Sequence, residues 1–316
     1  MTFRRKLLTV FAVTVFLSVA AVALLVQLIT RNAFEKTENA RTAALVSQFQ
    51  REFSRRGDEV ARRVQGIAAS DPANRMATAL NGTSANSAEY FDLARSMAES
   101  HQLNFLEFLD WHGTIVSSAQ WPAKFGYPDT QIGDLTALSG QGPFLKLEDL
   151  QDATALGLFT VRAVAVAEHP VYVVGGRRLD RDFLSALDLP ADMRVLLYQN
   201  RSDHFSPDLL VAASSDSAEE SVRPAEKLAP LIEAAEKNNS EISGVVKWSS
   251  DAADDELFHA IPLRGVGKDH PLLAVLLIGN SRRSYVELTR RLRDSALLVG
   301  GGGIVLAILL LSLIHI

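Results

Sequence analysis

One apolar stretch of the sequence contains a single arginine that could hold an acidic ligand. Arg162 lies in the run LGLFTVRAVAVA and Tyr172 in VYVVGGRRL, and both runs are typical of strands. A guanidinium in an apolar strand can bind a carboxylate through two parallel hydrogen bonds. Aromatic residues in the segment expected to cover the same sheet could close such a pocket, namely Trp121, Phe125 and Tyr127. The pattern predicts a small-ligand site at these five residues. The alternative is an Arg162 that faces solvent and aromatic residues that belong to an ordinary core.

Other chemistry is poorly represented in the sequence. It contains no G-x-S-x-G or H-E-x-x-H motif and no phosphate-binding P-loop. The chain has no cysteine, which excludes disulfides and thiolate metal sites, and its seven histidines are scattered singly. The acidic run DAADDE (251–256) misses the spacing of a calcium-binding loop and fits a solvated hairpin loop better. We therefore expect no catalytic residue, no metal site and no cofactor in this chain.

The charge pattern excludes another class of function. The net charge is −5, and the basic residues form no patch of the kind that binds nucleic acid. We therefore expect no nucleic-acid partner.

Apolar runs lie near both ends of the chain. The uncharged run 7–29 would form a helix of roughly 35 Å at about 1.5 Å per residue, enough to cross a hydrocarbon core of about 30 Å. It exceeds the h-region of a cleaved signal peptide and is followed by no clear cleavage site. A second run, 295–314, is also long enough to span. These runs predict two transmembrane helices, and the lipid bilayer is thus an expected partner.

The orientation follows from the flanking charges. Arg4, Arg5 and Lys6 favour a cytoplasmic N-terminus. The body between the two spans would then lie outside the membrane, and the C-terminus would return to the cytoplasm. The expected localisation is a bacterial inner membrane, with the main body in the periplasm.

The second apolar run contains residues that favour close helix packing. Ala296 with Gly300, and Gly303 with Ala307, form two pairs of small residues four positions apart. Such pairs let membrane helices approach closely. We expect a tight helix contact here, within one chain or across a homodimer, whereas the alternative is a flexible glycine hinge.

The body between the spans alternates helical and strand patterns. A helix with one apolar stripe is predicted over 33–69, and a second helix over 90–102. The intervening segment 71–91 has the composition of a loop. A hairpin with its turn at WHG, around Gly113, then opens a first set of strands. A second set follows, at MRVLLYQN, EISGVVKWSS, ELFHAIPLR and PLLAVLLIGN, with a helix near 225–237.

An internal echo indicates two lobes of related build. VYVVGGRRLDRDFL and AVLLIGNSRRSYVEL each run from an apolar strand through glycine to paired arginines and a helix. The predicted order is a cytoplasmic N-terminus 1–6, a transmembrane helix 7–29, a stalk and connecting helix 30–104, a distal lobe 105–182, a second lobe 183–284, a juxtamembrane helix 285–294 and a second transmembrane helix 295–316.

This arrangement resembles the N-terminal half of a bacterial sensor histidine kinase whose periplasmic region is of the double Cache, PAS-like type. The resemblance covers essentially the whole chain. It is carried by MTFRRKLLTVFAVTVFLSVAAVALLV, LNFLEFLDWHGTIVSSAQWPAKFGY, GLFTVRAVAV with VYVVGGRRLD, and LLAVLLIGNSRRSYVELTRRLRDSALLVGGGGIVLAILL. It implies an α+β fold with two PAS-like lobes on a long N-terminal helix, flanked by two transmembrane helices. The arginine and aromatic signature of amino-acid-binding double Cache receptors is not found, which speaks against an amino-acid ligand.

The resemblance also implies a function and partners. The chain would bind an unidentified small ligand or a periplasmic protein, dimerise, and relay a helix displacement to a HAMP and kinase output. That output would use ATP and magnesium to phosphorylate a histidine and then a response regulator. It is absent from this sequence, and residues 312–316 are interpreted as a non-native end of a truncated chain. The alternatives are a membrane-tethered periplasmic scaffold or binding protein, and the sensor of a chemoreceptor or nucleotide cyclase.

Overall fold

The computed structural model describes residues 3–82, 90–130, 132–151, 153–164, 169–187, 189–201, 204–212, 224–266, 270–291, 293–295, 298 and 301–302. The chain divides into two compact units. One unit consists of Met1–Ala44, Val245–Leu257 and Asn280–Ile316. The other, called the main unit below, consists of Leu45–Gly244 and Phe258–Gly279.

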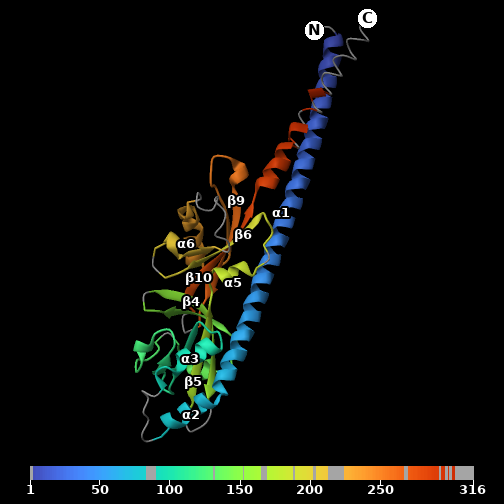
Figure 1. The fold of residues 1–316 in the computed structure, drawn as a ribbon. Coiled ribbons are helices and arrows are strands. Elements are labelled where there is room, and N and C mark those ends of the chain that lie inside the picture. The colour runs from blue at the N-terminus through green and yellow to red at the C-terminus, as the bar shows by residue number, and fades with distance from the viewer. Residues whose placement is uncertain are drawn as a thin grey trace. The chain divides into compact units, whose positions relative to one another are not determined.

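The elements form an α+β fold, as the sequence predicts (Figure 1). The helices are α1 (Phe3–Ala68), α2 (Asp71–Leu80), α3 (Leu93–Ser100), α4 (Leu135–Leu138), α5 (Arg181–Ser185) and α6 (Ala229–Asn238). The strands are β1 (Phe105–Leu109), β2 (Ile115–Ser118), β3 (Phe144–Asp149), β4 (Thr154–Val164), β5 (Val171–Arg178), β6 (Met193–Gln199), β7 (Leu210–Ala212), β8 (Ile242–Val246), β9 (Glu256–Arg264) and β10 (Leu272–Ser281).

Two antiparallel five-stranded sheets share one strand order. The first sheet runs β2-β1-β5-β4-β3 and the second β7-β6-β10-β9-β8. The central position of each sheet is therefore taken by the strand next to a pair of arginines: β5 ends in Arg177 and Arg178, and β10 precedes Arg282 and Arg283. The two sheets therefore repeat one topology, as the internal echo suggests, whereas the lobe boundaries 105–182 and 183–284 stay a prediction.

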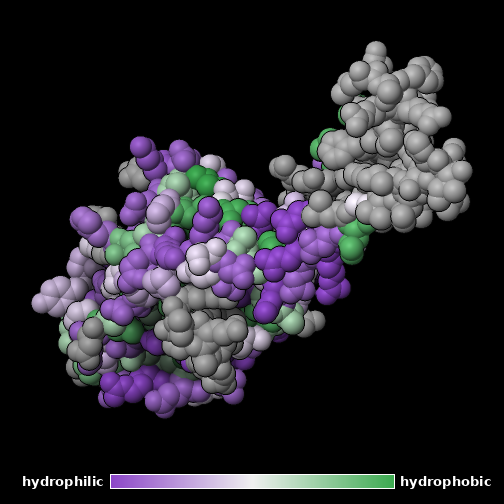
Figure 2. Space-filling view, turned by 90° about the horizontal axis from the view of Figure 1, so that it is seen from above, coloured by the Kyte–Doolittle hydropathy of each residue, from purple (hydrophilic) through white to green (hydrophobic). Residues whose placement is uncertain are grey.

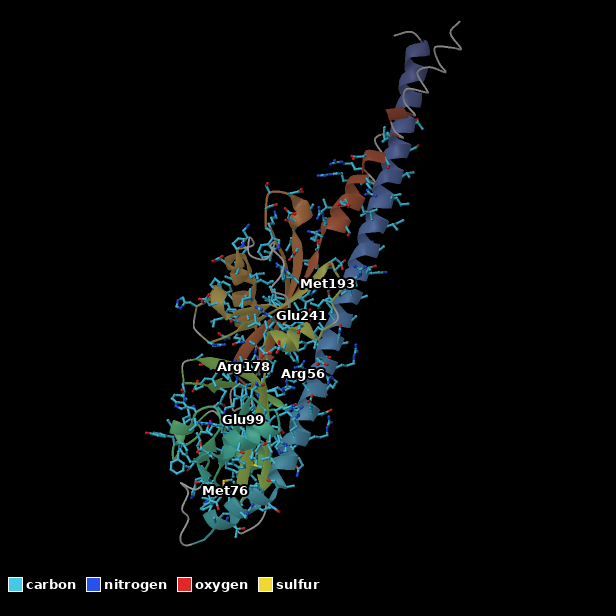
Figure 3. The ribbon with its side chains drawn as sticks, in the orientation of Figure 1. Arg56, Met76, Glu99, Arg178, Met193 and Glu241 are labelled. Carbon is cyan, nitrogen blue, oxygen red and sulfur yellow. The ribbon has the colours of Figure 1, made fainter. Side chains whose placement is uncertain are left out.

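Helices cover one face of the first sheet, called the helix face below. Val60, Val64 and Ile67 of α1 are fully buried against it, in the stripe that the sequence predicts. Met76 of α2, labelled in Figure 3, is buried in the same core. A Cβ atom at Gly175 would lie only 2.4 Å from Val64, so glycine at this position lets α1 pack closely on β5.

A second core of the main unit connects the two sheets. Leu45 and Phe49 of α1 pack with Leu158 of β4, Phe183 of α5 and Leu197 of β6. Burying an aliphatic or aromatic side chain of this size contributes about 1.5–3 kcal/mol. The two sheets are thus joined by apolar packing that includes the same helix. The surface in Figure 2 shows hydrophobic residues in small separate patches among hydrophilic ones.

The prediction of a loop over 71–91 is wrong for its first part, where α2 forms. The side chain of Ser70 caps α2 by accepting a hydrogen bond from the Ala73 amide, and Pro72 lies in the first turn, where its missing N–H costs nothing. Strand β3 was not predicted either, although the hairpin of β1 and β2 is confirmed, with Gly113 at φ 82°.

The expected membrane spans receive no support from the structure. Across the described stretches of the chain, no helix combines the length and the apolarity that crossing a bilayer requires. The four predicted packing residues of the second span lie outside the described residues; they are Ala296, Gly300, Gly303 and Ala307.

Candidate functional site

The face of the first sheet opposite the helices carries a mixed apolar and charged cluster. Because side chains alternate along a strand, Phe105, Leu109, Phe144, Phe159 and Tyr172 share this face. It packs against Ile132 and Leu135 of the segment 119–143. We call this side the loop face and residues 119–143 the cover segment, residue 131 of which lies outside the described part.

Two glycines let aromatic rings lie flat on the loop face. The rings of Phe105 and Phe159 stack with their centres 5.1 Å apart. A Cβ atom at Gly157 would lie 2.5 Å from the Phe159 ring, and one at Gly176 would lie 2.6 Å from it. Arg178, at the end of β5 in Figure 3, holds its guanidinium 5.9 Å from the centre of the Phe105 ring. The sheet therefore presents an aromatic floor beside which a cation already lies.

A buried lysine forms a network of ionic contacts above this floor. Lys146 Nζ of β3 lies 2.7 Å from Glu148 Oε2 and 2.8 Å from Asp129 Oδ2 of the cover segment. Gln120 Nε2 donates to Glu148 Oε1 at 3.1 Å, and Lys146 Nζ lies 5.4 Å from the centre of the Phe159 ring. We call Lys146, Asp129, Glu148 and Gln120 the Lys146 network.

The charged members of this network are shielded from water. The side chains of Lys146 and Asp129 are each 6% exposed, and that of Glu148 is 2% exposed. Burial opposes the charged form of Lys146, but the carboxylates of Glu148, Glu107 and Asp129 outweigh it and raise the pKa of the lysine. Lys146 is therefore a permanent cation.

Glu107 of β1 is the least satisfied member of the cluster. It is 2% exposed and shares the loop face with Phe105 and Leu109. Among the described residues, its Oε1 atom has no hydrogen-bond partner. Burial first, and then the neighbouring charges of Glu148 and Asp129, raise the pKa of Glu107 to about 7, although Lys146 and a hydrogen bond from Ser118 act in the opposite direction.

The cluster holds more negative than positive charge. Three carboxyl groups, those of Glu107, Asp129 and Glu148, accompany one ammonium group, that of Lys146. A buried charge without a partner is costly, so the surplus is reduced by a proton on Glu107 or by an added cation. Chemically the arrangement can bind a proton or a small charged group. No group of three metal-ligating side chains suited to a metal ion occurs within the described ranges.

Of the two predicted strand residues, Tyr172 lies on the same face as this cluster and Arg162 does not. Tyr172 is buried, and its hydroxyl lies 2.9 Å from Thr136 Oγ1 in the cover segment. Arg162 is opposite Val173 in the register of β4 and β5, whereas Tyr172 is opposite Ala163. The two side chains therefore point to opposite faces of the sheet, and Arg162 Nη1 donates to the carbonyls of Val161 and Gln141.

The three predicted aromatic residues lie in the cover segment, at its surface. Phe125 is 37% and Tyr127 66% exposed, and Trp121 is half-buried beneath Lys124, whose Nζ lies 4.7 Å from the centre of its ring. The segment that the sequence identified thus contributes to the cluster through Gln120 and Asp129, next to these aromatic residues in the chain.

Sequence reasoning missed Glu107, Lys146, Glu148 and Asp129. A signal was present in FLEFL (105–109), where one glutamate is flanked by apolar residues on both sides, and in the alternation of FLKLED (144–149). An isolated charge inside an apolar strand requires a partner of opposite charge, and the charged residues of two such strands could pair with each other.

Comparisons with known proteins give no family. No family model and no curated protein matches the chain. Solved structures to which the chain is similar include the sensor domain of the Vibrio cholerae histidine kinase DctB (TM-score 0.46, 12% identity, 78% of this chain and 98% of that chain). They also include the periplasmic domain of Vibrio cholerae LuxQ (TM-score 0.43, 14% identity, 76% and 99%). A third is the sensory domain of the Campylobacter jejuni chemoreceptor Tlp3 with isoleucine bound (TM-score 0.44, 12% identity, 80% and 95%). These structural neighbours are thus the sensor domain of a histidine kinase, a periplasmic domain and the sensory domain of a chemoreceptor.

Proposed function

We propose that this chain is the extracytoplasmic sensor region of a membrane receptor of the sensor histidine kinase type, and that it binds a small ligand on the loop face of the first sheet. The observation that carries the proposal is the buried Glu107 carboxyl group, which has an oxygen without a partner in the described chain and lies beside the Lys146 network. A fold gains little stability from buried charges that are incompletely paired. Binding is a reason to keep them.

The helix α1 offers a route by which binding could be relayed. It continues without a break from the apolar run 7–29 to residues that pack on the first sheet. In our proposal the run 7–29 crosses the inner membrane and the body lies in the periplasm. Helix displacements of about 1–2 Å are typical of such relays, and a ligand drives one only by binding one state better than the other.

The remaining parts of the receptor follow from the same proposal. We expect the chain to dimerise, with the small residues of the run 295–314 packing in the bilayer. The output would be a kinase that uses ATP and magnesium and passes a phosphoryl group to a response regulator. Labelling engineered cysteines of the full chain in intact cells with a reagent that does not cross the inner membrane tests the orientation, because a body that cannot be labelled from the periplasmic side would contradict it.

A ligand screen tests the binding part of the proposal directly. The purified full chain, in detergent, is heated in the presence of small charged and neutral metabolites, and its melting temperature is recorded. We expect at least one compound to raise the melting temperature equally in the parent chain and in the exposed variant Lys237→Gln, but by a different amount in Lys146→Gln, because that variant changes the charge of the site. A compound that stabilises all three chains equally binds elsewhere, and that result would remove the first sheet from the proposal.

A further inference from the structure

We infer that the loop face of the first sheet takes a small organic ammonium ion, held against the carboxyl group of Glu107. This inference rests on the proposed function, because it names the chemical class of the ligand that the same site would bind. It does not involve Arg162, whose side chain points to the opposite face of the sheet.

The charge balance of the site favours a cation over an anion. Lys146 is already engaged by Asp129 and Glu148 at 2.8 and 2.7 Å. A carboxylate ligand would have to displace one of these partners and would add a fourth negative group to a buried cluster. An ammonium group would instead supply the second positive charge that three carboxylates lack. It would also give Glu107 Oε1 the hydrogen-bond donor that it does not have among the described residues.

The surroundings of Glu107 suit an organic cation better than a metal ion. The stacked rings of Phe105 and Phe159 form the floor, and cations lie near both of them, Arg178 at 5.9 Å and Lys146 at 5.4 Å from the ring centres. Ammonium groups are attracted to the faces of aromatic rings. A divalent metal would require several oxygen ligands converging on one point, and no such group occurs in the part of the chain that is described.

The proton on Glu107 makes the inference sharply testable. An ammonium ion binds the ionised carboxylate, so it competes with the proton that the raised pKa of about 7 retains. Its affinity should therefore increase as the pH rises through 7, by about tenfold between pH 6 and pH 8 for competition with one proton. A carboxylate ligand would show the opposite trend, because it would bind best while Glu107 is protonated.

The experiment is isothermal titration calorimetry on the full chain with methylammonium, 1,4-diaminobutane, acetate and succinate, each at pH 6 and pH 8. We expect an amine to bind about ten times more tightly at pH 8. We expect Glu107→Gln to lose this binding and its pH dependence, and the exposed Glu99→Gln to keep both. Because Glu107→Gln removes a buried charge without changing the side-chain volume, its melting temperature at pH 8 should equal or exceed that of the parent, which verifies folding.

The outcomes separate the two proposals. Binding of acetate or succinate that strengthens at pH 6, with no response to amines, would overturn the ammonium assignment and leave the sensor proposal standing. Amine binding that persists in Glu107→Gln would also overturn the assignment. If every compound in the wider screen shifted the melting temperatures of the parent chain and of Lys146→Gln equally, the proposed function itself would fail.

Discussion

The two lobes place a cation over an aromatic ring in the same way, but the cation of the first lobe is a buried lysine and that of the second a half-buried arginine. In the first lobe the ring of Phe159 lies on Gly176 and Lys146 Nζ is 5.4 Å from its centre. In the second, the ring of Phe258 lies on Gly279 and the guanidinium carbon of Arg194 is 5.1 Å from its centre. The ring, the glycine and the cation therefore belong to the repeated architecture.

In the first lobe the ammonium group lies among buried carboxyl groups. Asp129 and Glu148 bind Lys146 directly, and Glu107 adds a third buried carboxyl group nearby. The packing of a cation on an aromatic ring does not by itself require three buried carboxyl groups nearby. The comparison thus separates what the fold needs from what we assign to binding, and the following variants test that separation.

Removing the central cation should have the largest effect. Lys146→Met leaves Glu148 and Asp129 buried without their partner, and breaking a buried ion pair in this way costs about 3–5 kcal/mol. Arg194→Met should cost less, about 1–2 kcal/mol, because Arg194 is only half-buried on β6, so water can replace part of what its guanidinium loses besides the contact with the Phe258 ring. Urea unfolding of the full chain measures both, and equal losses would mean that the two cations have the same role.

The pH dependence of stability should be specific to Glu107. Its pKa is about 7 in the folded chain against 4.5 as the ordinary value, so between these values the folded state binds more protons than the unfolded state. Stability should therefore fall as the pH rises from 4.5 through 7, by up to about 3 kcal/mol. Unfolding curves of the parent and of Glu107→Gln across this range check the effect. A slope that survives in Glu107→Gln would assign it to another group.

Filling the glycine positions should affect both lobes alike. A Cβ atom at Gly176 or Gly279 would lie 2.6 Å from a phenylalanine ring, and overpacking of this kind costs about 1–3 kcal/mol. We expect similar losses for Gly176→Ala and Gly279→Ala in thermal unfolding. Gly142→Ala serves as the control, because nothing lies within 4 Å of its added Cβ atom. Very unequal losses would break the structural equivalence of the two rings.

The smallest difference concerns one tyrosine in each sheet. Tyr172 contacts Thr136 Oγ1 at 2.9 Å, whereas the Tyr198 hydroxyl reaches the His204 carbonyl only at 3.5 Å. Tyr172→Phe should cost about 1 kcal/mol, the usual net value of a buried hydrogen bond, and Tyr198→Phe should cost less. Denaturant titration resolves the pair, and a larger loss in Tyr198→Phe would show that the contact of the cover segment is the weaker one.

Most of the fold could be predicted from local patterns. The stripe of α1 and the glycine turn between β1 and β2 depend on residues close together in the chain, so periodicity and turn chemistry identify them. Helix α2 was missed because its loop-like composition outweighed the start signals at Ser70 and Pro72. Its buried apolar residues are Ala73, Met76 and Ala77. They cover little more than one turn, which is too short a pattern to predict a helix by itself.

The candidate site could not be predicted in the same way, because it depends on strand order. Strands β1 and β3 are separated by β5 and β4 in the sheet, so no local pattern indicates that Glu107, Lys146 and Glu148 belong to one cluster. Likewise, Arg162 and Tyr172 were assigned to one pocket, but their faces follow from the register of β4 and β5. A shift of one residue would have reversed that result.

Hydrogen exchange with mass spectrometry, on the full chain with and without a compound found in the screen, tests most directly whether the first sheet is where the molecule senses. Slower exchange in β1 and in the cover segment on binding, with unchanged exchange in α6 and β8, is the predicted result. Protection confined to the second lobe, with β1 and residues 119–143 unaffected, would contradict it.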